Sequence, residues 1–264
     1  MHPVLFTLPV FGRHLEIPTY GVLLAAAFLL VLKAAGRLAR REGIDPRTVT
    51  DYCLATFLSG LLGAKVLLII LDLPYYWRHP GDLLGTIRSA GVFYGGLLAG
   101  IPVGIWFVRR RRLPLWKMAD IAGACAPIGL SIGRLGCLAA GCCFGKPTHL
   151  PWAITFTLPA TARATGVPLD QPLHPTQIYL SLNALVLAVL LLAFYRHKKY
   201  DGQIFLWFVI LYGATRTFWE LFRGDDVRGF LVPGVISTSQ AIGSVSMVTA
   251  IIVLILRRRQ LRRS

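Results

Sequence analysis

Long apolar segments separated by short polar connections dominate the chain. Seven of them have roughly the length of a membrane-spanning helix, because a hydrocarbon core of about 30 Å needs about 20 helical residues. No internal repeat, low-complexity tract or linker interrupts the pattern. It predicts an all-α integral membrane protein with a single domain over residues 1–264. The predicted spans are residues 17–38, 49–71, 91–108, 116–140, 177–195, 202–222 and 235–256.

The basic residues alternate from one side of these segments to the other. Most of the 28 Lys and Arg residues lie in the connections 33–47, 109–117 and 196–201 and in the tail after Leu256. Cytoplasmic loops carry such an excess, so we expect seven transmembrane helices with the N-terminus outside. The net charge of +16 then reflects anchoring beside anionic lipid, and we expect no nucleic-acid partner.

Two arginines lie inside predicted spans, where a charge is costly. A charged side chain at a helix centre costs roughly 2.5–3.5 kcal/mol, so intramembrane arginines usually face a polar cavity. Helix rise places Arg134 and Arg216 in the outer halves of their spans. Glu220 lies one turn beyond Arg216, and Gly133 beside Arg134 allows close approach of a ligand. The alternative is that each arginine reaches the interface by itself.

Other spans bring polar or small residues to the same level. Because guanidinium groups bind phosphate through paired hydrogen bonds, the pattern predicts a phospholipid-headgroup site that opens outward. For Tyr20 alone, a place in the aromatic belt is an equally good explanation. The residues predicted to bind substrate at this level are Tyr20, Gly95, Gly96, Gly133, Gln177, Tyr179 and Arg223.

The five cysteines form two sets. Cys53 and Cys125 lie toward the inner side, where they are expected to pack as small apolar residues. Cys137, Cys142 and Cys143 lie at the outer face, where a disulfide from Cys137 to one of the other two is an alternative to free thiols. We expect no metal site, because no outer His or Cys supplies a fourth ligand. No cofactor is expected either.

The sequence around these positions resembles the prolipoprotein diacylglyceryl transferase family over nearly the whole chain. The resemblance rests on residues 17–21, 94–97, 133–137, 141–145, 151–156, 174–179 and 212–216. The family transfers the diacylglyceryl group of phosphatidylglycerol to the lipobox cysteine of a preprolipoprotein signal peptide, and glycerol phosphate leaves. The resemblance implies these partners and a place in the bacterial inner membrane. It also implies a small outer head from the 141–176 loop, with a short strand at 152–157.

Several positions depart from the family pattern. Tyr94 stands where the best-known members have a histidine, which excludes a histidine base at that position. Cys137, Ala140 and Cys142 stand where their signature has two asparagines and a glutamate, and Leu180 stands where a glutamate often follows. The resemblance carries over three other functional positions unchanged: Tyr20, Arg134 and Arg216.

The expected reaction needs a thiolate and stabilisation of a departing phosphate. We assign Arg134 and Arg216 to the phosphate and the developing charge. Tyr94 is expected to form a hydrogen bond to the headgroup or the thiol. Glu220 either orients an arginine or acts as general base. His174 either accepts the thiol proton or serves as a capping or packing residue before Pro175.

Two other functions stay open at this point. One is a transferase that uses the same lipid donor with another acceptor. The other is a membrane protein that binds or transports phospholipid without catalysis, although we find no inverted repeat of the kind seen in transporters.

Overall fold

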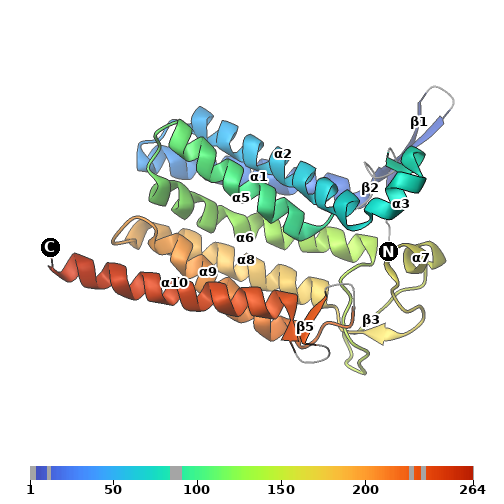
Figure 1. Ribbon diagram of the computed structural model, residues 1–264. Helices are drawn as coiled ribbons and strands as arrows, with labels where there is room; N and C mark the ends of the chain where they lie inside the picture. The colour runs from blue at the N-terminus through green and yellow to red at the C-terminus, as the bar shows by residue number, and fades with distance from the viewer. Residues whose placement is uncertain (1–3, 11–12, 84–90, 226–228, 233–235, 264) are drawn as a thin grey trace. The chain divides into compact units, whose positions relative to one another are not determined.

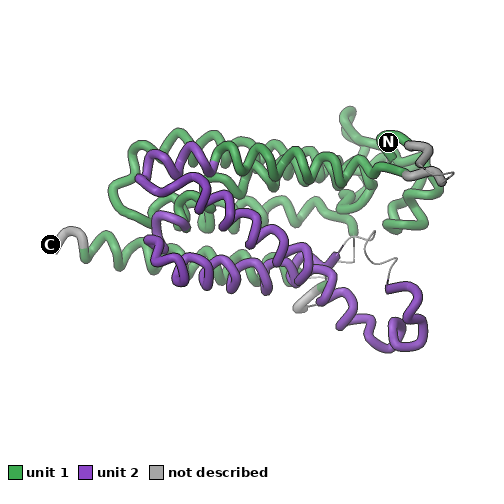
Figure 2. The backbone as a smooth tube through the Cα atoms, turned by 90° about the horizontal axis from the view of Figure 1, so that it is seen from above, with its two compact units in different colours: residues 1–34, 119–264 green, residues 35–118 purple. Residues whose placement is uncertain are grey.

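The computed structural model describes residues 4–10, 13–83, 91–225, 229–232 and 236–263, which are mostly helical (Figure 1). The chain forms two compact units, shown in Figure 2: a smaller one of residues 35–118 and a larger one of residues 1–34 and 119–264. The single-domain expectation stays a prediction. The long helices are α1 (Thr19–Glu42), α2 (Pro46–Leu71), α5 (Phe93–Arg110), α6 (Leu115–Ala140), α8 (Thr176–Phe194), α9 (Gln203–Glu220) and α10 (Thr238–Arg263).

Each of the seven predicted spans coincides with one of these helices. In the described part of the chain, five helices are long and apolar enough to cross a membrane: α1, α2, α6, α8 together with the short helix η2 (Tyr195–His197), and α10. The chain is thus a multi-pass membrane protein. The other two, α5 and α9, have 18 residues each. Both carry charges within these 18 residues: α5 ends in Arg109 and Arg110, and α9 contains Arg216 and Glu220.

The smaller unit is built around close packing of α2 against α5. Glycines on both helices let the backbones approach, as is common between membrane helices. A Cβ on Gly96 would lie 3.2 Å from the carbonyl oxygen of Gly60, and a Cβ on Gly95 would overlap Gly63. At the start of α2, Asp45 accepts hydrogen bonds from the Thr48 side chain and backbone, which hold its pKa below the usual value.

Asp120 fixes the beginning of α9 against α6 in the larger unit. Its fully buried carboxylate accepts hydrogen bonds from the backbone N–H groups of Gly202 (2.8 Å) and Phe205 (3.0 Å). The Lys198 Nζ lies 3.1 Å from the same carboxylate. The carboxylate thus satisfies free N–H groups at a helix N-terminus, where negative charge is favourable.

Small residues bring further helices of this unit together. A Cβ on Gly213 of α9 would lie 2.8 Å from the carbonyl oxygen of Gly243 on α10. The Ser181 hydroxyl of α8 donates a 2.8 Å hydrogen bond to the Ser131 carbonyl of α6. Figure 1 shows α8, α9 and α10 running alongside one another.

Residues 141–175 form a small head between α6 and α8, as the resemblance implied for the 141–176 loop, and its place on the outer side stays a prediction. The predicted strand is present but shorter, because β3 covers only Ile154–Thr155, and it pairs antiparallel with β4 (Pro172–Leu173). The head also contains a helix that was not predicted, α7 (Pro159–Thr165). The apolar core of the head consists of Phe144, Phe156, Val167 and Leu173.

Short elements outside the long helices were also missed by the sequence analysis. The prediction of an all-α protein holds for the helical body, but two further antiparallel hairpins accompany it. These elements are β1 (Val4–Val10) with β2 (Arg13–Pro18), β5 (Phe230–Val232) with β6 (Ile236–Ser237), the helix α3 (Leu73–Arg78) and the short helix η1 (Pro80–Asp82).

Candidate functional site

Three arginines of the larger unit lie within electrostatic range of one another. Arg134 lies in the last two turns of α6, Arg216 near the end of α9, and Arg223 just beyond α9. The charge of Arg134 acts on both Arg216 and Arg223, and Tyr212 of α9 interacts with Arg134 and Arg216 alike. The structure therefore brings together the two arginines that the sequence singled out, and it adds a third.

Glu220 connects two of these arginines. Its carboxylate forms an ion pair with the Arg216 guanidinium one turn earlier on α9, and its Oε2 lies 4.0 Å from Nη1 of Arg223. The Arg216 Nη2 also donates a 3.3 Å hydrogen bond to Ser239 of α10. Arg216, Glu220 and Arg223 are 8%, 4% and 5% exposed, so these charges interact in a region of low dielectric. Such a carboxylate is placed to orient an arginine; the catalytic role stays a prediction.

Arg223 has a second partner that the sequence analysis did not select. Its Nε donates a 2.9 Å hydrogen bond to Oδ1 of Asp225, and its Nη2 bonds the other carboxylate oxygen. Burial lowers the pKa of Arg223, but the hydrogen bonds and charge of Asp225, together with Cys143 and Glu220, raise it above its ordinary value. The available signal was an acidic residue two positions after the arginine, across a glycine.

Tyr20 packs beside the arginine-bearing end of α6. A Cβ on Gly136 would lie 2.7 Å from Cδ2 of the Tyr20 ring, so only glycine fits at that position. A Cβ on Gly133, in contrast, would meet no atom within 4 Å. Tyr20 therefore lies close to Arg134, and the α6 surface at Gly133 is open.

The start of α8 holds the loop after α6 in place. The Gln177 Nε2 donates a 2.8 Å hydrogen bond to the Cys142 carbonyl, and the Thr176 hydroxyl donates one of the same length to the Cys143 carbonyl. Gln177 is fully buried. Its observed contact is thus with the protein, and its predicted role in substrate binding stays a prediction.

His174 belongs to an aromatic group and does not cap α8. Its Nδ1 lies 3.3 Å from the Tyr179 hydroxyl, which also accepts a 2.7 Å hydrogen bond from the Trp152 indole. The His174 ring packs edge-on against Phe222, with 5.4 Å between the centroids, and α8 begins without a side-chain cap. The capping alternative is therefore wrong, and packing and proton acceptance remain.

Tyr94, Gly95 and Gly96 belong to the smaller unit. Tyr94 is the second residue of α5, is half-buried and packs edge-on against Phe93 at 6.0 Å between ring centroids. Packing against α2 by itself accounts for the two glycines. The substrate contacts predicted for these three residues stay predictions.

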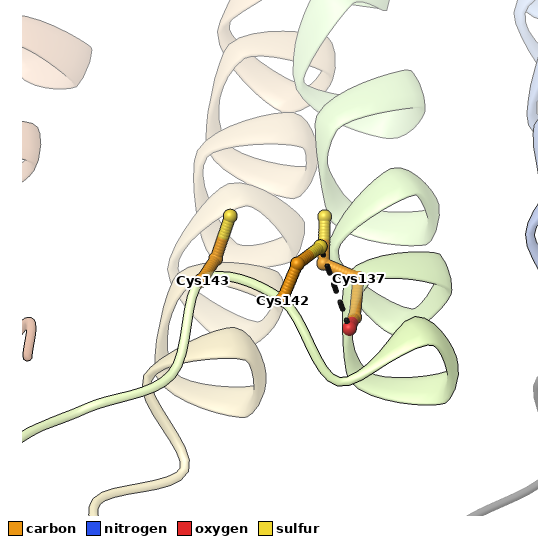
Figure 3. A group of neighbouring side chains, drawn as sticks. All are labelled: Cys137, Cys142 and Cys143. Atoms are coloured by element: carbon orange, nitrogen blue, oxygen red, sulfur yellow. Dashed lines mark hydrogen bonds between the residues drawn. The ribbon is translucent and has the colours of Figure 1, made fainter. Parts of the chain in front are cut away.

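The loop after α6 also carries two of three clustered thiols (Figure 3). The Sγ atoms of Cys137, Cys142 and Cys143 all lie within 4.8 Å of one another, and all three are free thiols. Hydrogen bonds from Cys137 and Cys142 hold the pKa of Cys143 well below its usual value, and the charges of Arg134 and Arg223 add to this effect, although burial opposes it. The structure thus has free thiols in place of the disulfide that the sequence analysis kept as an alternative, and the convergence of all three was not predicted.

Comparisons with known proteins agree with the sequence resemblance. The family model of prolipoprotein diacylglyceryl transferase matches residues 3–256. The phosphatidylglycerol–prolipoprotein diacylglyceryl transferase of Clostridium tetani is 33% identical over 96% of this chain and 96% of its own length. The protein of the same name from Geobacter sulfurreducens is 33% identical over 88% of both chains, and that from Finegoldia magna 31% identical over 97% of this chain and 96% of its own. This chain therefore belongs to the prolipoprotein diacylglyceryl transferase family.

Proposed function

We propose that this protein transfers the diacylglyceryl group of phosphatidylglycerol to the lipobox cysteine of a preprolipoprotein. The observation that carries the proposal is the group of three guanidiniums at the ends of α6 and α9. Glu220 and Asp225 fix two of them. Within the described part of the chain no carboxylate forms an ion pair with Arg134. That guanidinium is thus available to a phosphate, and the neighbouring Gly133 leaves room for a ligand to approach α6.

The guanidiniums serve the step in which charge moves onto the phosphate. The lipobox sulfur forms a bond to the glyceryl carbon, the bond from that carbon to the phosphate oxygen breaks, and the electron pair leaves with glycerol phosphate. Arg134 and Arg216 stabilise this charge, because fixed donors in a poorly solvated site act most strongly where charge develops. The thiol proton passes to His174, with Glu220 as the alternative acceptor.

The topology of the proposal follows from the charge pattern. All seven helices cross the bacterial inner membrane with the N-terminus outside, and the head lies on the outer face. The arginine group then lies at the depth of the outer lipid headgroups. In this proposal Tyr94 donates a hydrogen bond to the headgroup or the thiol.

The purified protein in phosphatidylglycerol vesicles provides the test. With a lipobox peptide, we expect the peptide mass to rise by one diacylglyceryl group while glycerol phosphate is released in equal amount. Vesicles of phosphatidylcholine serve as the donor control, and a peptide with Cys replaced by Ser serves as the acceptor control. Glycerol phosphate release without peptide modification would indicate another acceptor. Saturable binding of phosphatidylglycerol without any reaction would favour the lipid-binding function and refute catalysis.

A further inference from the structure

The three clustered thiols have the arrangement of a metal-binding site. Among the residues that the structure describes, one group of His, Cys or carboxylate side chains is close enough to hold one ion: Cys137, Cys142 and Cys143. Figure 3 shows Cys137 on the last turns of α6 and the other two on the following loop, with the sulfur of Cys142 directed toward Cys137. Nothing in the proposed transfer reaction uses these thiols.

The distances suit a single ion with three thiolate ligands. Three sulfurs bound at about 2.3 Å to one ion lie about 3.8–4.0 Å apart. The observed separations are at most 4.8 Å, so each sulfur needs to move by about 1 Å or less. The sequence analysis argued against a metal because a fourth protein ligand is missing, but a fourth protein ligand is not required. Soft thiolate ligands select Cu⁺, which is bound by few of them. Zn²⁺ sites with three protein ligands complete their coordination shell with water.

The backbone that carries these cysteines is held from two sides. Gln177 and Thr176 bind the carbonyls of Cys142 and Cys143. The adjoining segment pairs with the loop after α9, through a 3.1 Å hydrogen bond from Gly224 N–H to the Phe144 carbonyl. Contacts of this kind hold metal ligands in position, and removing one commonly lowers metal affinity by roughly 10–100-fold.

The surrounding charges favour an anionic metal–thiolate complex. Among the described residues of this group, the guanidiniums of Arg134, Arg216 and Arg223 outnumber the carboxylates of Glu220 and Asp225. The positive charges of Arg134 and Arg223 act directly on Cys143. Three thiolates around Zn²⁺ carry one net negative charge, which this excess of positive charge offsets. Three thiolates around Cu⁺ carry two, so Zn²⁺ fits the surroundings better.

We propose that Cys137, Cys142 and Cys143 bind one thiophilic closed-shell cation, with Zn²⁺ as the best match, and that the occupied site slows the transferase. Binding forms three metal–sulfur bonds and releases the three thiol protons to solvent. The complex then attracts the Arg134 guanidinium, which the lipid phosphate also needs. The effect on the transfer rate rests on the proposed function; the metal site itself does not.

The binding experiment uses the full-length reduced protein in detergent with Cys53 and Cys125 replaced by Ala. We expect one Zn²⁺ per chain by equilibrium dialysis, and thiolate-to-metal charge-transfer absorbance when Cd²⁺ is used instead. Changing all three clustered cysteines to Ser should abolish both signals, and Cys143→Ser alone should weaken binding about 100-fold. A parallel titration with Cu⁺ under a competing chelator decides between the two cations.

The outcomes separate the site from its effect on activity. Absence of binding by both cations, or binding that survives the triple Ser change, would overturn the metal site. A disulfide between two of these cysteines that persists under reducing conditions would also overturn it. Gln177→Leu keeps all three thiols, so a loss of affinity of about tenfold there supports a preorganised site even if a Ser variant folds poorly.

The activity arm compares the metal-free and metal-loaded protein in phosphatidylglycerol vesicles. We expect a rate lower by about fivefold or more, restored by a chelator. An unchanged rate with one bound ion would overturn the regulatory effect and leave the metal site standing. If no form of the protein transfers lipid, the proposed function fails, while the binding measurements still decide the question of the site.

Discussion

The guanidinium of Arg216 forms an ion pair with the carboxylate of Glu220, one turn further along α9, and both side chains are almost fully buried. A buried pair of this kind holds a charged side chain in one orientation, because removing either partner leaves an uncompensated charge in the interior. In the proposed reaction, Glu220 therefore acts on the phosphate through the position of Arg216.

Glu220→Gln should destabilise the protein and impair lipid binding together. We expect a loss of about 3–5 kcal/mol in the free energy of unfolding, because the buried guanidinium loses its counter-charge. Thermal unfolding in detergent and the KM for phosphatidylglycerol measure the two effects. Glu42→Gln is the matched control, since it removes the more exposed 3.5 Å pair with Lys117, which is worth at most about 1 kcal/mol. Equal effects of both changes would contradict the positioning role.

Arg134→Lys and Arg216→Lys should each retain the charge and lose most of the activity. Lysine lacks the planar fork that binds two phosphate oxygens, and loss of one such donor typically lowers kcat by roughly 100–1,000-fold. Arg110→Lys, at an exposed position, is the matched control. Near-normal thioether formation in both site variants would refute the phosphate-binding role.

Asp225→Asn should weaken the hydrogen bonds that hold the Arg223 guanidinium and leave the contacts of Arg134 and Arg216 unchanged. The amide cannot accept both hydrogen bonds of the guanidinium, and we expect about 1.5–3 kcal/mol of lost stability. If Arg223 contributes to phosphate binding, the KM for phosphatidylglycerol rises as well. Asp225→Glu, which keeps the charge and both acceptor oxygens, should recover part of this loss. A KM that stays at the wild-type value would leave Arg223 with a purely structural role.

Gly136→Ala and Gly133→Ala form a pair that separates packing from ligand access. The added methyl at position 136 would lie 2.7 Å from the Tyr20 ring, so we expect a stability loss of about 1–3 kcal/mol from overpacking. The methyl at position 133 meets no atom, so stability should stay unchanged. If the lipid approaches there, only the KM for phosphatidylglycerol rises. Unchanged kinetics in Gly133→Ala would argue that the headgroup binds elsewhere.

Asp120→Asn should destabilise the protein without a specific effect on chemistry. The change removes one of the two carboxylates that pair with Lys198, and Asp201 at 3.1 Å remains as the other. We therefore expect a loss below the roughly 3–5 kcal/mol of a buried pair whose charge is left uncompensated. We expect a lower Tm and an unchanged kcat for the protein that remains folded. A large loss of kcat at an unchanged Tm would mean that Asp120 influences the site directly.

The sequence predicted most of the helical body because a membrane span is a local property of length and apolar composition. Each predicted span coincides with a helix, including α9 despite its two charges. The hairpins and α7 were missed because short elements of two to seven residues carry little periodicity. The strand at Ile154–Thr155 was predicted, but its partner Pro172–Leu173 is distant in the chain, and the pairing could not be predicted from local pattern.

Two candidate site residues could be selected from the sequence because placing their charges in a membrane span costs free energy. Arg134 and Arg216 stand out because a charge in an apolar segment needs a reason. Asp225 lies in a polar loop where an acidic residue is unremarkable, and only the folded chain shows that it binds Arg223. The substrate-binding role of Gln177 stays a prediction, and only the folded chain shows that its buried amide donates a hydrogen bond to the Cys142 carbonyl.

The amino-acid sequence by itself determined the helical segments, the two arginines within them and the family, because each of these is written in residue type and spacing along the chain. Only the tertiary structure decided which groups meet. The ion-pair network from Arg216 to Asp225 and the convergence of Cys137 with Cys142 and Cys143 depend on how α6, α8 and α9 pack and on the hydrogen bonds that hold the loop after α6. Contacts of that kind arise from distances in space that no pattern along the chain records.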